Sequence, residues 1–189
     1  MKIVIIFHSV CGNTYLMAQE FYNAFKEKKQ NVEMYRVEDS TLDKTAQIFA
    51  PAQDFLTEIK KISVAAPQVM ENADLILLGS PTYFGNVSGQ MKLFMDATSP
   101  LWIKGKFIGK KLLAFASAGN SEGGGDLCLQ AINVYGQHMG MLNVSVPSNI
   151  KPGITVPAYG ILHYSGNGSV RPDKNKLAIA EMVNYLLLS

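Results

Sequence analysis

The first residues able to do chemistry come directly after an apolar run at the N-terminus. That run, KIVIIF, continues as HSVCGNTY over residues 8–15. Ser9 and Thr14 supply hydroxyl groups, Asn13 supplies an amide, and Gly12 lets the backbone approach a ligand closely. A helical pattern follows at once, so the free N–H groups and positive dipole end of that helix would face this loop. Such a loop can hold a phosphate dianion without any lysine.

The same loop has a simpler interpretation. Ser, Asn and Thr are preferred at helix N-termini, where they cap free backbone N–H groups. The loop does not match GxxxxGK[ST], the motif of P-loop NTPases, nor the GxGxxG motif of dinucleotide-binding proteins. Taken alone, it is therefore either a phosphate seat or an ordinary helix cap.

A second loop, GSPTYFGN (79–86), also follows an apolar run. It places Tyr83 and Phe84 between Pro81 and Gly85, although loops at sheet ends are usually polar. Contact with a planar ring would explain the two aromatic residues. The alternative is that they cover the end of the sheet or a subunit interface.

A third loop, SAGNSEGGG (117–125), has four glycines in nine residues. Glycine lets the backbone approach a flat ligand and offer its own N–H groups; the alternative is a flexible turn. In open α/β sheets, ligands bind outside the carboxyl ends of the strands, where the strand order reverses. Because all three loops follow expected strands, we expect them to surround one crevice.

The elements that must position these loops alternate between strand and helix. Such alternation predicts a doubly wound α/β domain over residues 1–189, with a parallel sheet and helices on both faces. Residues 38–70 are ambiguous, and residues 147–172 are expected to form a Pro/Gly-rich loop. The expected strands are 3–7, 31–37, 73–80, 110–118 and 141–146, and the expected helices are 14–25, 88–98, 126–138 and 173–188.

Composition excludes several classes of protein. The 189 residues are 48% hydrophobic and 17% charged with a net charge of +2, which argues against disorder, nucleic-acid binding and a strongly acidic electron carrier. Two cysteines, Cys11 and Cys128, are too few for a structural zinc or iron–sulfur site, and they favour a reducing compartment. No apolar run approaches the about 20 residues of a membrane span, so a cytoplasmic location is expected.

Several segments resemble known flavoproteins. HSVCGNT resembles the phosphate loop of the flavodoxin-like FMN proteins. GSPTYFGNVSGQMKLFMDATSPLW, ASAGNSEGGG, HMGM and YG…SGNGSVRP resemble the tryptophan-repressor-binding-protein family of FMN-dependent NAD(P)H:quinone oxidoreductases, with residues 79–102 the most specific part. The resemblance spans nearly the whole chain. It implies a five-stranded flavodoxin-like sheet of order 2-1-3-4-5, bound FMN, and a homo-oligomer, either dimer or tetramer.

The resemblance also assigns site residues. Trp102, Cys11 and Met139 would contact substrate, and His138 is the candidate catalytic residue. Trp102 would reach a neighbouring subunit's pocket; alternatively, it is a core or interface anchor. The residues implied to bind FMN are Ser9, Val10, Cys11, Gly12, Asn13, Thr14, Pro81, Thr82, Tyr83, Phe84, Gly85, Asn86, Ser117, Ala118, Gly119, Asn120 and Gly123.

The chain departs from this family at three positions. The family often has an aromatic residue in place of Cys11 and an arginine in place of Tyr83. It tends to have two adjacent histidines before Gly-Met, whereas this chain has His138 followed by Met139. Either His138 or Met139 could therefore face the flavin, and His138 could instead be a cation at a helix C-terminus.

The expected function is two-electron reduction of a quinone by NADH or NADPH in a ping-pong cycle on FMN. Three alternatives stay open: a flavodoxin-type one-electron carrier, a non-enzymatic FMN-binding regulatory or interaction module, and an NADPH:FMN or azo-dye reductase. The sequence does not choose between NADH and NADPH, and it does not name the electron acceptor.

Overall fold

The computed structural model describes residues 1–188. The strands are β1 (Lys2–Phe7), β2 (Asn31–Arg36), β3 (Leu75–Pro81), β4 (Lys111–Ala118), β5 (Leu142–Asn143) and β6 (Ile161–Tyr164). The α-helices are α1 (Asn13–Glu27), α2 (Leu42–Ile48), α3 (Leu56–Lys61), α4 (Gly89–Ala97), α5 (Ser99–Ile103), α6 (Gly125–His138) and α7 (Lys176–Leu188). Three short 3-10 turns are η1 (Ala50–Ala52), η2 (Pro67–Met70) and η3 (Pro172–Asn175).

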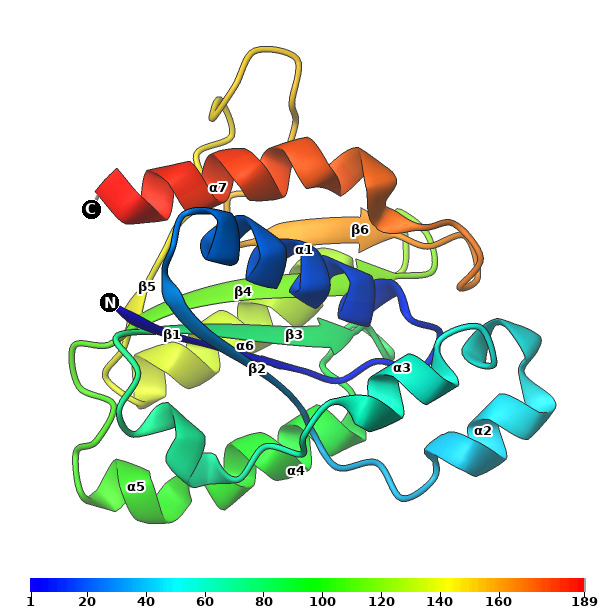
Figure 1. The fold of residues 1–189 in the computed structure, drawn as a ribbon, viewed down its shortest axis with the longest axis horizontal. Helices are drawn as coiled ribbons and strands as arrows, with labels where there is room; N and C mark the ends of the chain where they lie inside the picture. Colours follow the sequence, from blue (N-terminus) through cyan, green and yellow to red (C-terminus); the bar gives the residue numbers. More distant parts are fainter. Residues whose placement is uncertain (189) are drawn as a thin grey trace.

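The strands form one parallel sheet of order β2-β1-β3-β4-β5. This order confirms the doubly wound, flavodoxin-like arrangement. The sheet has six strands instead of the expected five, because β6 also pairs with β4. Figure 1 shows β6 lying alongside β4 beneath α7.

Two short strands share the edge beside β4. β5 pairs with Lys111 and Leu112, and β6 pairs with Phe115–Ala118 further along the same strand. The chain leaves the sheet between them, and within the intervening segment the N–H of Val146 donates to Ala158 O at 3.0 Å. The expected strand 141–146 is therefore strand only at Leu142–Asn143, and the expected loop 147–172 contains β6.

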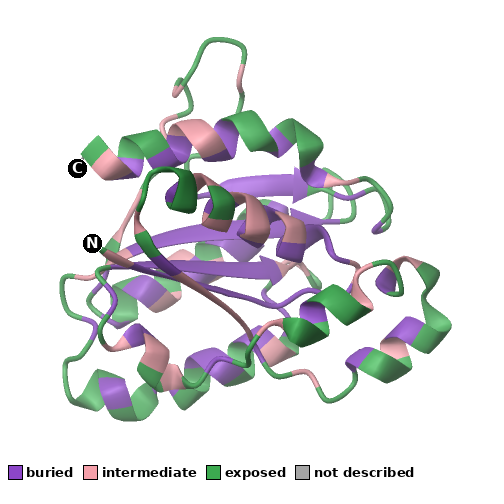
Figure 2. Cartoon of the chain, viewed as in Figure 1, coloured by how far each residue is buried: buried purple, intermediate pink, exposed green. Residues whose placement is uncertain are grey.

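Helices cover both faces of the sheet, which explains the continuous apolar run of β1. Ile3, Ile5 and Phe7 point into the core shared with α1 and α7. Val4 and Ile6 point into the core shared with α4 and α6. Strands buried on both faces read as unbroken apolar runs, and Figure 2 shows the buried centre of the sheet.

The segment 38–70, ambiguous in sequence, folds as α2, η1, α3 and η2. α2 and α3 lie beyond the carboxyl ends of β1 and β2, and the chain then returns to η2 near the start of β3 (Figure 1). Phe55 fixes the segment to the first loop. Its ring lies 6.1 Å from that of Tyr15, measured between centroids, and it packs directly on Gly12. None of the helices in residues 1–188 is both long and apolar enough to cross a membrane.

Candidate functional site

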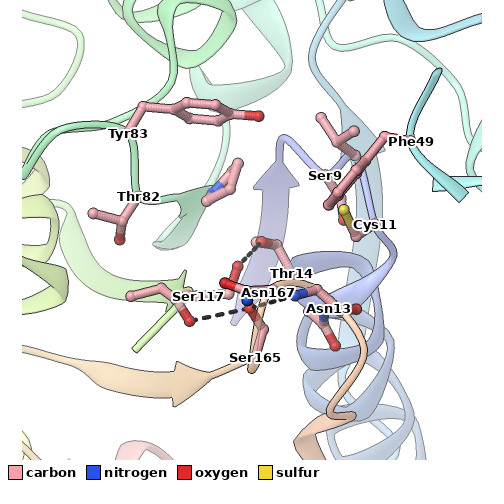
Figure 3. Close-up of a pocket in the computed structure, with 15 residues that line it drawn as sticks. Ser9, Cys11, Asn13, Thr14, Phe49, Thr82, Tyr83, Ser117, Ser165 and Asn167 are labelled. Carbon is pink, nitrogen blue, oxygen red and sulfur yellow. Dashed lines mark hydrogen bonds between the residues drawn. The ribbon is translucent and has the colours of Figure 1, made fainter. Parts of the chain in front are cut away.

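A cavity of about 190 Å³ lies at the carboxyl ends of β1, β3 and β4 (Figure 3). The strand order reverses between β1 and β3, so the cavity occupies the position where open α/β sheets bind ligands. It is lined by Ser9, Val10, Cys11, Asn13, Thr14, Phe49, Pro81, Thr82, Tyr83, Ser117, Ala118, Gly119, Ser165, Asn167 and Gly168.

The structure brings the three predicted loops together, although not every predicted residue lines the cavity. Eleven predicted residues line it, namely every residue of the set above from Ser9 to Gly119 except Phe49. The predicted residues that do not line it are Gly12, Phe84, Gly85, Asn86, Asn120, Gly123, Trp102, His138 and Met139.

The first loop presents free backbone donors. The N–H groups of residues 9–15 donate to no protein acceptor within the described residues 1–188. The Ser9 side chain is buried, and its Oγ likewise has no partner in that part of the chain. Buried N–H groups are nearly always paired, and a helix N-terminus with unpaired donors is suited to an anion. This donor set fits a phosphate group.

Two side chains of this loop, Thr14 and Asn13, form hydrogen bonds with other parts of the protein. Thr14 Oγ1 and Ser117 Oγ lie 2.9 Å apart and are buried. One hydroxyl donates to the other, so the accepting hydroxyl keeps its own proton for a ligand. Asn13 Nδ2 donates to Gly168 O at 2.9 Å, so its amide also connects the first loop to the loop around Gly168.

Gly12 lies in the first loop, and its backbone conformation and packing both favour glycine. Its φ is +87°, in the left-handed region that favours glycine. A Cβ at this position would lie 2.2 Å from Cδ2 of Phe55. Glycine therefore suits both this conformation and the close packing of Phe55 at the start of α1.

The second loop forms a tight turn. The N–H and C=O groups of Tyr83 and Asn86 bond to each other reciprocally, at 2.9 and 3.0 Å. Phe84 and Gly85 between them have φ of +51° and +73°, as in a type I′ turn. The turn holds Tyr83 at the cavity wall and leaves the Phe84 side chain fully exposed. Burial raises the pKa of Tyr83 above its ordinary value, and nearby Cys11 and Asp39 add to the effect, so its hydroxyl stays protonated.

Only the first residues of the third loop line the cavity. Thr82 N donates to Ser117 O at 2.7 Å, which joins the second and third loops. Ala118 and Gly119 line the cavity, whereas the backbone of Asn120 accepts from Gly123 N at 3.2 Å and closes a turn outside it.

Phe49 was missed by sequence reasoning. It stands across the cavity mouth from Tyr83, close to Cys11 (Figure 3). The available signal was an aromatic residue in a segment that follows the carboxyl end of a predicted strand.

The loop 165–168 was missed as well. Ser165 bonds to Ala118 O through both its N–H, at 2.7 Å, and its hydroxyl, at 3.1 Å. These bonds bring Asn167 and Gly168 to the cavity. The glycine-rich SGNGS that follows β6 could have pointed to this loop had β6 been recognised as a strand.

Trp102, His138 and Met139 lie far from the cavity of their own chain. α6 begins beside Ala118 and ends at His138, and its 14 residues span about 20 Å. Trp102 Nε1 donates to His138 O at 3.1 Å, so the three residues gather at the opposite end of the sheet.

Both cysteines are free thiols. Burial raises the pKa of Cys11 at the cavity, although the positive charge of Arg171 opposes the shift. Burial raises the pKa of Cys128, in the core behind the second loop, to about 11. Both groups are therefore protonated at neutral pH and poorly nucleophilic.

Comparison with known proteins agrees with this architecture. The flavodoxin, WrbA-like protein of Agrobacterium tumefaciens has a TM-score of 0.63 and 20% identity, with 99% of this chain and 98% of that one covered. Oxidised Flavodoxin 1 of Bacillus cereus has a TM-score of 0.64 and 19% identity, with 100% and 98% covered. At these identities the likeness concerns the fold.

Sequence relatives are more specific. A protein of Acidithiobacillus ferrooxidans described as NAD(P)H dehydrogenase (quinone) is 32% identical over 190 residues, covering 95% of this chain and 91% of the relative. One of the same description from Syntrophobacter fumaroxidans is 30% identical over 187 residues, covering 94% and 91%. The family model for NADPH-dependent FMN reductase matches residues 1–151. The chain therefore belongs to the NADPH-dependent FMN reductase family.

Proposed function

We propose that this chain is an FMN-dependent NAD(P)H:quinone oxidoreductase. The observation that carries the proposal is the row of free N–H groups over residues 9–15, at the switch point of a flavodoxin-like sheet. Family membership supports a flavin cofactor, and the relatives described as NAD(P)H dehydrogenase (quinone) support the two substrates. The motifs at residues 79–102 support the finer assignment to the tryptophan-repressor-binding-protein group.

Each wall of the cavity has a role in this proposal. Residues 9–15 would hold the phosphate, while residues 117–119 and 165–168 would enclose the sugar chain of FMN. The enclosed volume of about 190 Å³ is below the roughly 300–1,000 Å³ of ligand pockets. The flavin ring would therefore lie at the open mouth, beside Tyr83 and Phe49.

The bound cofactor would supply the redox chemistry, with hydride accepted from NAD(P)H in one half-reaction and a quinone reduced in the other. The protein's residues orient the partners and stabilise charge through backbone N–H groups of the second and third loops. We propose that Trp102, His138 and Met139 act at the cavity of a neighbouring copy in a homo-oligomer.

One titration tests the function. Apoprotein is titrated with FMN, then with NADH or NADPH, and then with benzoquinone, and the flavin absorbance is followed. We expect FMN binding tighter than riboflavin binding, bleaching by the nicotinamide, and return of colour with the quinone. Binding without bleaching would contradict the enzymatic role, and absence of FMN binding would contradict the assignment of the first loop.

A one-electron carrier is the second candidate, favoured by Phe49 facing Tyr83 across the mouth. Aromatic rings on both faces of a flavin would leave little room for a stacked nicotinamide. Stepwise reduction with dithionite separates the candidates, because an accumulating blue semiquinone indicates a carrier and direct two-electron bleaching indicates the oxidoreductase.

A further inference from the structure

Arg171 joins the three segments that surround the phosphate loop, although it does not line the cavity. Its Nη1 donates to Cys11 O at 2.6 Å and to Gly168 O at 3.0 Å. Its Nη2 pairs with the carboxylate of Asp54 at 2.5 Å, and its guanidinium carbon lies 4.8 Å from the centroid of the Phe55 ring. One side chain thus touches the first loop, the 165–168 loop and the segment before α3.

The bond to Cys11 O has a geometric consequence for the donors. In a planar trans peptide, the C=O and N–H groups point in opposite directions. Fixing the Cys11 carbonyl on Arg171 therefore turns the N–H of Gly12 away from Arg171. That N–H belongs to the row of free donors between Cys11 and Asn13, both of which line the cavity.

The charge and the packing of Arg171 also suit it to orient this loop. Residues 8–15 contain no Lys or Arg, so Arg171 is a cation that reaches this loop from outside it. Its charge is matched by Asp54, and its flat face is covered by Phe55. The planar guanidinium can bond several carbonyls at fixed angles, whereas a lysine ammonium acts as a point charge.

We propose that Arg171 is a positioning residue for the flavin phosphate: it orients the Cys11–Gly12 peptide so that the N–H faces the ligand, and it holds the neighbouring loops in place. This inference rests on the proposed function. It does not require Arg171 to touch the cofactor.

The test compares variants that separate charge from geometry. Arg171→Lys keeps the charge and loses the planar fork, whereas Arg171→Met loses both. Asp54→Asn removes the ion-pair partner but leaves the donor to Cys11 O in place. Lys151→Met is the matched control, because it breaks the 2.6 Å ion pair with Glu181 on α7, outside the cavity lining.

Dissociation constants for FMN and for riboflavin are measured by quenching of flavin fluorescence. We expect Arg171→Met and Arg171→Lys each to weaken FMN binding at least about tenfold, because an oriented charge-assisted network is lost. Riboflavin has no phosphate, so its binding should weaken by less than about threefold. Lys151→Met should bind both flavins as the wild type does, and Asp54→Asn should lie between.

Several results would overturn the inference. Full FMN affinity in Arg171→Lys would show that charge suffices, and equal losses for the two flavins would show general collapse of the pocket. Thermal unfolding identifies a variant that has lost its fold, and Arg171→Lys, the milder change, then decides. If the wild type binds FMN and Arg171→Met binds it equally well, only this inference fails. If the wild type does not bind FMN, the proposed function fails too.

Discussion

His8 and Asp39 form a buried hydrogen-bonded pair next to the first loop. His8 Nε2 lies 3.1 Å from Asp39 Oδ2, and both side chains are only 3% exposed. The other oxygen of Asp39 accepts from the backbone N–H and the hydroxyl of Thr41, at 2.8 and 2.7 Å. The bond from His8, with help from Thr41, holds the pKa of Asp39 well below its usual range. The pair links the end of β1 to the segment that carries Phe49.

We expect Asp39→Asn to lower the free energy of unfolding by about 2 kcal/mol at pH 7, because hydrogen bonds to a charged group are lost. A carboxyl with a depressed pKa stabilises the fold fully above its unfolded pKa of about 3.9, and this contribution disappears as pH falls through the folded pKa. Urea unfolding at pH 7 and at pH 3 measures this. The difference between wild type and variant should shrink at pH 3.

Asp43→Asn is the control for this prediction. Asp43 pairs with Lys60 at 2.9 Å, but both side chains are about half exposed, and such a pair contributes only about 0–1 kcal/mol. A loss at Asp39 no larger than the loss at Asp43 would contradict a stabilising role for the buried pair.

At the scale of elements, the long strands and helices were predictable, β5 was predicted to be longer than it is, and β6 was not predicted. β1, β3 and β4 are apolar on both faces, and α1 and α4 bury evenly spaced apolar residues. ILHY of β6 is only four residues long and follows a Pro/Gly-rich stretch. Its place in the sheet depends on long-range pairing with β4, which local pattern does not contain.

The same distinction holds for the candidate site. Ser9, Thr14, Tyr83 and Ser117 were predictable because they follow recognisable strands. Phe49 lies at the cavity through tertiary contacts of its segment, in which Phe55 packs on Gly12 and Asp54 pairs with Arg171.

The absence of a side chain at Gly160 lets the chain pass close to β4 just before β6 begins. The φ of Gly160 is +151°, and a Cβ at this position would lie 2.3 Å from the backbone O of Ala114 in β4. Because a backbone atom cannot move aside easily, we expect Gly160→Ala to cost about 3 kcal/mol of unfolding free energy. FMN affinity should fall too, since β6 leads directly into the 165–168 loop. Urea unfolding and FMN titration measure the two effects.

Gly153→Ala is the matched control, because Gly153 has φ of +82° with nothing within 4 Å of an added Cβ. It should cost only about 1 kcal/mol for the backbone conformation, and it should leave FMN binding unchanged. Equal losses in the two variants would show that steric conflict with β4 is not what matters at Gly160.

At the scale of the whole molecule, the cavity is assembled from five separate parts of a chain with a net charge of only +2. The donors that we propose for the phosphate are neutral N–H groups, and the nearby Arg171 is already paired with Asp54. Buried contacts are screened by salt much less than exposed charges. We therefore expect the FMN dissociation constant to change by less than about threefold between roughly 0.05 and 0.5 M NaCl.

Fluorescence titrations at several salt concentrations check this expectation. A steep rise of the FMN dissociation constant with salt would contradict a phosphate-binding site built from neutral donors. It would indicate that exposed cations bind the phosphate instead.

The edge of the sheet beside β4, which is formed by the two short strands β5 and β6, also affects the tendency to aggregate. A long, flat edge strand offers unpaired N–H and C=O groups to other chains. Here that edge consists of two residues of β5 and four of β6, and Asn175 Nδ2 occupies Leu162 O at 2.8 Å. The opposite edge, β2, carries Glu33 and Arg36, and its carboxyl end is bonded to residues 63 and 65. Both edges of the sheet are therefore poor templates for pairing with the edge strands of other copies. We expect this to disfavour β-sheet aggregation at high protein concentration.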